Sequence, residues 1–186
     1  MRIAIFGAGG QLGRDLTQRL GDDAVALTRQ QAEIHDAEQV AAALDAAKVD
    51  AVINAAAYNF VDAAEDDPEA VFRGNAVGPR VLARECAKLD LPFLHVSTDY
   101  VFGADGSRST PYREDDAPGP VSVYAASKLS GEHLVRLTAQ KHFIVRTCGL
   151  YGQPAPQSKG NFVQTIRRLA TERDELRAHG IGITNQ

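Results

Sequence analysis

Two side chains that could move a proton lie one helical turn apart. Tyr124 and Lys128 are four residues apart in a stretch with a helical pattern, so both project from one face of the expected helix. An ammonium group on that face would stabilise a phenolate and lower the tyrosine pKa from about 10 toward neutral pH. The tyrosine would then serve as a proton donor for a carbonyl oxygen. The same spacing also arises by chance on solvated helices, so the pair needs support from the rest of the chain.

That support begins with a glycine-rich turn near the N-terminus. The apolar residues 2–6 predict a buried parallel strand, and a helical pattern runs over residues 11–20. Between them, Gly7 allows a tight turn, Gly10 lets the backbone approach a diphosphate, and Gly13 lets the helix pack closely on the strand. A purely structural turn is the alternative. The position of these glycines at the first strand–helix junction favours dinucleotide binding over that alternative.

The residues after the second expected strand bear on the choice of dinucleotide. Thr28 and Arg29 stand where such sheets often carry an acid for the ribose of NAD. A guanidinium can pair with a 2′-phosphate, so the sequence favours NADPH, with NADH as the second choice. Arg29 could equally be an ordinary surface arginine. Glu33 and Ile34, further along the same loop, are expected to flank the adenine.

Short apolar strands alternate with helical stretches along the chain. This order predicts an α/β fold with a doubly wound, mostly parallel sheet of the Rossmann type, in a single domain over residues 1–186. The expected strands cover residues 2–6, 24–27, 49–53, 93–96 and 143–145, and the expected helices cover 11–20, 37–47, 68–89, 124–141 and 161–175. Residues 103–120 are expected to form a surface loop beside the site, or else an insertion without a role.

Composition narrows the classes of partner. With 186 residues and 44% hydrophobic content, the chain can form one domain with a sizeable core. Its net charge of -4 and pI near 5.7 argue against nucleic acid as a partner. The apolar stretches are too short to cross a bilayer, and a glycine interrupts the N-terminal run too early for a signal peptide, so we expect a cytoplasmic protein without a membrane partner. The histidines and cysteines lack metal-ligand spacing, so no metal site is expected.

Five motifs occur in the order found in one enzyme family. They are Gly7-x-x-Gly10-x-x-Gly13, Asn54-Ala-Ala-Ala-Tyr58, Ser97-Thr-Asp-Tyr-Val-Phe102, Tyr124-Ala-Ala-Ser-Lys128-Leu-Ser-Gly-Glu132 and Arg146-Thr-Cys-Gly-Leu-Tyr-Gly152. With these motifs the chain resembles the extended short-chain dehydrogenases/reductases, and among them most of all the dTDP-4-dehydrorhamnose reductase family. The likeness covers nearly the whole chain. The second and third motifs are more specific to that family than the glycines or the Tyr–Lys pair.

The resemblance implies a reaction and a set of contacts. NADPH would reduce the C4 ketone of a dTDP-linked 6-deoxy-4-keto sugar, while Tyr124 donates the proton and Lys128 lowers the Tyr124 pKa and holds the nicotinamide ribose. Thr98 would orient the ketone and Asp99 would contact the sugar; without the Tyr–Lys pair, both would be interpreted as a strand end and a turn cap. The implied cofactor contacts are Gly7, Gly10, Gln11, Leu12, Gly13, Thr28, Arg29, Glu33, Ile34, Ala55, Ala56, Ala57, Tyr58, Asn59, Val96, Tyr124 and Lys128. A homodimer is compatible with the resemblance.

Two departures from the family pattern weaken the expectation about substrate. Gly149 stands where the family has a tryptophan, so a stacking contact with the sugar or the base is expected to be missing. Family members also continue for about 100 further residues that form a smaller substrate-binding lobe. We expect that lobe to be largely absent from these 186 residues. Cofactor binding would then survive while turnover is weak.

Two other functions stay open. A nucleotide-sugar epimerase or dehydratase would use the same tyrosine and lysine, but it would carry an acid after the second strand, and a dehydratase would carry Asp-Glu where this chain has Asp99 and Tyr100. The other function is a non-catalytic NADP-binding regulatory subunit, since a relative of the rhamnose reductases regulates methionine adenosyltransferase. Intact Thr98, Tyr124 and Lys128 favour the enzyme, whereas the missing lobe favours the subunit.

Overall fold

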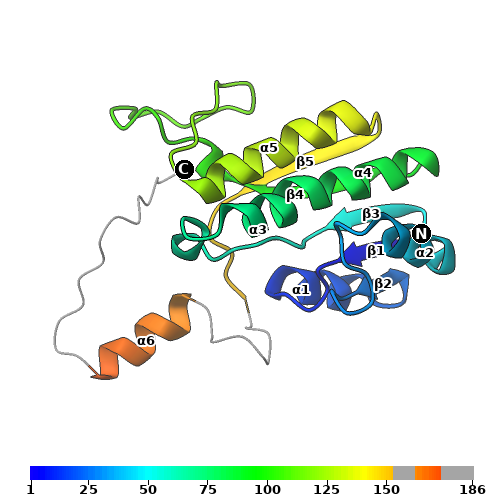
Figure 1. The fold of residues 1–186 in the computed structure, drawn as a ribbon. Helices are drawn as coiled ribbons and strands as arrows, with labels where there is room; N and C mark the ends of the chain where they lie inside the picture. The colour runs from blue at the N-terminus through cyan, green and yellow to red at the C-terminus, as the bar shows by residue number, and fades with distance from the viewer. Residues whose placement is uncertain (153–161, 173–186) are drawn as a thin grey trace.

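A computed structural model of the protein has a parallel five-stranded sheet in its described residues, which are 1–152 and 162–172 (Figure 1). The strands are β1 (Ile3–Phe6), β2 (Ala24–Leu27), β3 (Ala51–Asn54), β4 (Phe93–Thr98) and β5 (His142–Thr147). Their order in the sheet is β2-β1-β3-β4-β5, and each neighbouring pair is parallel. The prediction of a doubly wound α/β fold of the Rossmann type is therefore confirmed.

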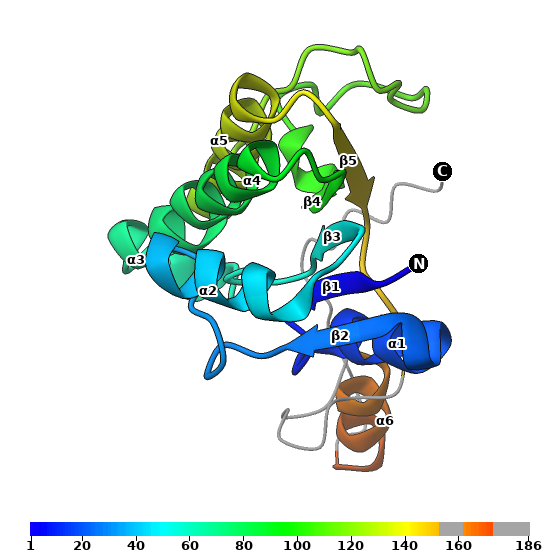
Figure 2. The same cartoon turned by 90° about the vertical axis from the view of Figure 1, so that its right-hand side faces the viewer.

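Helices cover both faces of this sheet. The helices of the described residues are α1 (Gln11–Leu20), α2 (Ala37–Ala47), α3 (Pro68–Phe72), α4 (Gly78–Lys88), α5 (Val123–Thr138) and α6 (Phe162–Glu172), with single turns η1 (Gly21–Asp23), η2 (Asp62–Ala64), η3 (Arg73–Val77) and η4 (Asp99–Val101). Figure 2 shows α1 on one face, beside β1 and β2, and α2, α4 and α5 on the opposite face. This division follows from right-handed crossovers between parallel strands. In the described part of the chain, no helix is both long and apolar enough to span a membrane.

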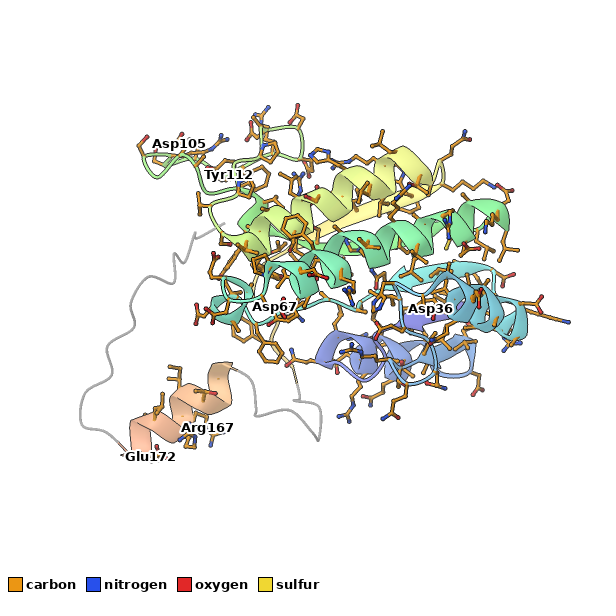
Figure 3. All side chains as sticks on the ribbon, in the orientation of Figure 1. Asp36, Asp67, Asp105, Tyr112, Arg167 and Glu172 are labelled. Atoms are coloured by element: carbon orange, nitrogen blue, oxygen red, sulfur yellow. The ribbon has the colours of Figure 1, made fainter. Side chains whose placement is uncertain are left out.

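Local sequence signals explain where two of these helices begin. The Asp36 side chain accepts hydrogen bonds from the backbone N–H groups of Glu38 and Gln39, and Asp67 accepts one from Ala70 (Figure 3). Aspartate is a favoured N-cap because its carboxylate satisfies first-turn N–H groups that have no partner within the helix. The predicted ranges 11–20 and 37–47 coincide with α1 and α2.

The core lies between the sheet and the α2–α4–α5 layer. Phe6, Val52 and Phe93 from neighbouring strands meet Leu44 of α2 and Leu82 of α4, and each is at most 2% exposed. Burial of a large apolar side chain contributes about 1.5–3 kcal/mol. These side chains thus hold the α2–α4–α5 layer against the sheet.

The single helix predicted over residues 68–89 is wrong in one respect. A π-helical turn, η3, separates α3 from α4. Pro79 has no N–H to offer the carbonyl of Asn75 four residues earlier, which disfavours a continuous α-helix at this point. A Cβ at Gly131 of α5 would lie 2.2 Å from that carbonyl oxygen, so α5 crosses unusually close here.

Several other helices and strands begin or end a few residues away from the predicted positions. The helix predicted over 124–141 ends at Thr138, and the strands predicted over 93–96 and 143–145 both run on to a threonine at the cleft described below. Of the helix predicted over 161–175, residues 162–172 form α6, while residues 161 and 173–175 lie outside the described residues.

Candidate active site

A cleft of about 770 Å³ lies at the carboxyl ends of four neighbouring strands. The register sets Phe6 beside Asn54 and Thr98 beside Thr147, so the loops that leave these strands start from one edge of the sheet. Open α/β sheets bind their ligands at this edge.

The cleft brings together most of the residues predicted for the site. Predicted residues that line it are Gly10, Gln11, Leu12, Ala55, Ala57, Asn59, Val96, Thr98, Asp99, Tyr124 and Lys128. Predicted residues that do not line it are Gly7, Gly13, Thr28, Arg29, Glu33, Ile34, Ala56 and Tyr58. Lining residues for which no contact was predicted are Gly9, Val61, Ser97, Tyr100, Thr147, Cys148, Gly149 and Leu150. Residues 147–150 end and follow β5, which lies beside β4 in the sheet. The expectation that the last two strands are neighbours could therefore have predicted that these residues line the cleft.

Gly7 and Gly13 shape the turn without lining the cleft. Gly7 has a φ of 83°, and a Cβ there would lie 2.5 Å from the backbone nitrogen of Ala56. A Cβ at Gly13 would lie 2.2 Å from the carbonyl oxygen of Gly7. Both positions therefore exclude a side chain, and together they bring the start of α1 against the strand ends.

The start of α1 fits the diphosphate of a dinucleotide. The helix begins after Gly10 with no side-chain cap, and Gly10, Gln11 and Leu12 all face the cleft. A helix N-terminus presents backbone N–H groups and a partial positive charge to an anion. The backbone N–H groups on this side of the cleft could therefore hold an anion such as the diphosphate of a dinucleotide.

Arg29 and Glu33 bind each other in this structure. The Arg29 Nε donates a 2.5 Å hydrogen bond to Glu33 Oε2, and the Arg29 side chain is 84% exposed. The other carboxylate oxygen of Glu33 lies 3.3 Å from His35 Nδ1. Ile34 is buried against Gly78, and Thr28 donates two hydrogen bonds to Gln31 Oε1. The predicted contacts of this loop with a cofactor stay predictions.

A buried polar network sets the loop after β3. Asn54 accepts a 3.0 Å hydrogen bond from the Ala56 N–H and donates one of 3.1 Å to His95 Nδ1. Both side chains are fully buried, and burial holds the pKa of His95 well below its usual value, so its ring is neutral. The run of small residues predicted to face the cofactor is thus held by the strand that precedes it.

A second network connects that loop to α5. The Asn75 side chain accepts a hydrogen bond from the Tyr58 N–H, and its amide nitrogen donates to the Tyr58 carbonyl and to Ser127 Oγ. Ser127 in turn donates a 2.7 Å hydrogen bond to the Tyr124 carbonyl oxygen. The first turn of α5 is therefore fixed relative to the strand ends, and this holds the Tyr124 side chain at the cleft.

The Tyr124 phenol is a protonated donor in this setting. Its side chain is 9% exposed, and burial is the main reason that its pKa is raised above 10. A hydrogen bond with the Thr98 side chain lowers that pKa in part, whereas Tyr100 and Asp99 raise it further. A phenol that keeps its proton at neutral pH can donate it to a developing alkoxide.

The expectation that Lys128 lowers the Tyr124 pKa is wrong for this structure. The Lys128 ammonium donates a 2.7 Å hydrogen bond to the Val96 carbonyl oxygen, and it is not among the groups that shift the Tyr124 pKa. Burial lowers the pKa of Lys128 itself to about 8, although the Glu132 carboxylate opposes this shift. Sequence spacing put both residues on one helix face correctly, but it could not show that burial dominates both pKa values.

Comparisons with known proteins show the family of the chain. The RmlD substrate binding domain family matches residues 1–180. The chain belongs to the RmlD/dTDP-4-dehydrorhamnose reductase family. A dTDP-4-dehydrorhamnose reductase from Mycolicibacterium smegmatis is 45% identical over 172 residues, which are 91% of this chain and 51% of that protein. The spore coat polysaccharide biosynthesis protein SpsK from Bacillus subtilis is 37% identical over 179 residues, 95% of this chain and 61% of that protein.

Solved structures of this RmlD family share the fold. The dTDP-4-dehydrorhamnose reductase from Bacillus anthracis, in complex with NADP, has a TM-score of 0.85 and 36% identity, and covers 94% of this chain and 61% of that one. An ortholog from Clostridium acetobutylicum has a TM-score of 0.86. This chain thus spans about half to three fifths of the length of these relatives.

Proposed function

We propose that this cleft serves the NADPH-dependent reduction of the C4 ketone of a dTDP-6-deoxy-4-keto sugar, which converts dTDP-4-dehydrorhamnose to dTDP-L-rhamnose. The observation that carries the proposal is the convergence of Thr98, Tyr124 and Lys128 on the cleft that also receives the uncapped start of α1. Membership of the RmlD family and an NADP complex of one relative support the same reaction.

Three side chains of the cleft have different roles in the proposed reduction. Tyr124 donates its proton to the alkoxide that develops at C4, and Thr98 holds the phenol and the sugar oxygen in reach of each other. Lys128, with a pKa of about 8, is mostly charged at neutral pH and lines the cleft beside Val96, where its ammonium can hold the ribose hydroxyls of the nicotinamide half of the cofactor. NADPH, when bound, supplies the hydride.

The side chains after β2 support a cofactor preference that is not absolute. Arg29 is exposed and carries the charge that a 2′-phosphate requires, but Glu33 competes for the same guanidinium. NADPH is the preferred cofactor in this proposal. NADH is also accepted, because the Glu33 carboxylate can accept a hydrogen bond from the 2′-hydroxyl of its adenosine ribose.

A titration followed by turnover tests the function. Binding of NADPH and NADH is measured by fluorescence, and consumption of NADPH with dTDP-4-dehydrorhamnose by absorbance. Tyr124→Phe should reduce kcat by about 100-fold or more because the proton donor is lost, and it should weaken NADPH binding by less than about tenfold because at most one hydrogen bond to the cofactor is lost. Tyr112→Phe, which removes a phenol hydroxyl from a residue outside the cleft lining, is the matched control. Binding of NADPH without turnover would contradict the reductase and favour a regulatory subunit.

A further inference from the structure

A fully buried carboxylate ties three elements together behind the cleft. Glu132, on α5, is 0% exposed and lies one helical turn after Lys128. Its Oε1 accepts a 2.6 Å hydrogen bond from Ser97 Oγ on β4. Arg146 on β5 donates to both carboxylate oxygens, at 3.0 Å from Nε and 2.7 Å from Nη2. The carboxylate therefore joins α5, β4 and β5 about two helical turns after the proposed proton donor.

Arg146 continues this connection into the loop after η4. Its Nη1 donates a 3.2 Å hydrogen bond to the Glu114 carbonyl oxygen, and its guanidinium lies 4.9 Å from the centre of the Phe102 ring. Phe102 stacks on Tyr112 with ring centres 4.3 Å apart and planes inclined by 12°. Arg108 covers the Tyr112 ring at 4.2 Å. Two stacked aromatic rings thus lie between two cations, from Arg146 on β5 outward to Arg108.

This stack organises the irregular segment of residues 103–120. Arg108 also donates a 2.6 Å hydrogen bond to Asp116 and bonds to the carbonyl oxygen of Pro111. Figure 3 shows Asp105 and Tyr112 on this segment, beside the start of α5. Residues 103–120 do not line the cleft themselves. Any effect of this segment on the cleft must therefore act through the residues to which it is bonded.

What it holds is the turn that forms one wall of the cleft. Ser97, bonded to Glu132, precedes the turn, and Phe102, covered by Arg146, ends it. Thr98, Asp99 and Tyr100 lie between these two anchors and face the cleft. The Tyr100 ring packs edge-on against Tyr124, with centres 5.9 Å apart.

We propose that Arg146 is a positioning residue: by bridging Glu132 and Phe102, it holds the turn of residues 98–102 so that the Thr98 hydroxyl stays in register with Tyr124. Its kinetic consequence rests on the proposed reduction, whereas the placement of the turn does not. Removal of one partner from a buried ion pair destabilises a protein whether or not the pair positions a site, so a stability measurement alone would not reveal this role.

Arg146→Met tests the proposal against a matched control. Arg136 also reaches the Glu132 carboxylate, at 3.3 Å, from a side chain that is 41% exposed, so Arg136→Met removes the same charge from the same partner without touching the turn. Arg146→Met should lower kcat at least about tenfold, because a misplacement of about 1 Å can cost about 100-fold. The dissociation constant for NADPH should change less than about twofold, and Arg136→Met should leave both within about twofold. Arg146→Lys should restore part of kcat, since it keeps the cation but loses the two-pronged bond.

Trypsin cleavage after Arg108 and Arg113 gives a readout that needs no substrate. Cleavage in this segment should become about tenfold faster in Arg146→Met than in Arg136→Met, since local opening exposes the loop. Equal cleavage rates in the two variants would overturn the proposal, and so would an unchanged kcat. If wild type shows no turnover of the sugar, the proposed reduction fails while the cleavage comparison still decides the role of Arg146.

A second variant covers the case in which Arg146→Met does not fold. Tyr112→Leu breaks the stack at its outer part and leaves the ion pair with Glu132 intact. It should speed cleavage after Arg113 several-fold and lower kcat less than Arg146→Met does. Cleavage and kcat both equal to wild type in Tyr112→Leu would overturn the proposal.

Discussion

Lys128 offers the sharpest test of the electrostatics of the site. Its pKa falls from 10.5 to about 8 because the ammonium is buried. One pKa unit corresponds to about 1.4 kcal/mol, so keeping this charge in the folded protein costs on the order of 3 kcal/mol at pH 7. Lys128→Met removes that cost, while it also removes the hydrogen bond to the Val96 carbonyl, which offsets about 1–2 kcal/mol of the gain.

The pH dependence separates these two contributions. Between pH 8 and pH 10.5 the unfolded chain binds more protons at Lys128 than the folded chain does, so wild-type stability rises with pH across this window. The cost of the charge should shrink from about 3 kcal/mol at pH 7 to below about 1 kcal/mol at pH 10. The stability advantage of Lys128→Met over wild type should therefore decrease by about 2–3 kcal/mol between these pH values.

Urea unfolding followed by circular dichroism at pH 7, 8, 9 and 10 measures this difference. Burial raises the pKa of the Cys86 thiol to about 12, but wild type and variant share this group, so its effect cancels. Lys48→Met, at an exposed position, is the control and should show a difference from wild type that stays within about 0.5 kcal/mol across the series. An advantage of Lys128→Met that is constant from pH 7 to pH 10 would refute the reasoning.

Three further predictions follow from contacts and charges near the cleft. Gly13→Ala should destabilise the protein by about 1–3 kcal/mol in urea unfolding and weaken NADPH binding, because its Cβ would meet a backbone oxygen at 2.2 Å; Gly9→Ala, with 4.0 Å of clearance, should be tolerated. Burial lowers the pKa of His95 well below its usual value, so the unfolded chain binds more protons at this residue than the folded chain does as pH falls from 7.5 to 5. Wild type should therefore lose stability relative to His95→Leu over this range in urea unfolding; a stability difference that does not change with pH would contradict this. Glu33→Gln should raise the affinity for NADPH over NADH several-fold by releasing Arg29, and Arg29→Met should lower it, as measured by fluorescence titration; equal ratios in both variants would exclude Arg29 from cofactor selection.

Features set by local sequence were predicted well. The glycine turn, α1 and the strand of residues 24–27 follow from backbone freedom at glycine and from apolar periodicity, and both are properties of a few neighbouring residues. The break at η3 was missed because it depends on Pro79 together with the close approach of Gly131, which is remote in sequence. The apolar periodicity of residues 68–89 cannot show that Gly131 approaches them.

The residues of the candidate site also fall into those that the sequence predicted and those that depend on tertiary structure. The strand–helix order by itself determined that residues after the strands of a parallel sheet meet at one edge, which is why most predicted residues line the cleft. The resemblance added the roles of Thr98, Tyr124 and Lys128. The residues after β5 were missed because only the sheet order makes β5 the neighbour of β4.

Sequence alone therefore determined the fold class, the glycine turn and the Tyr124–Lys128 pair, since chain stereochemistry and helical spacing act over short distances. Only the tertiary structure decided the direction of both pKa shifts and the pairing of Glu132 with Arg146. The physical reason is that desolvation and ion pairing depend on which remote groups surround a side chain, and that is settled when the strands and helices pack.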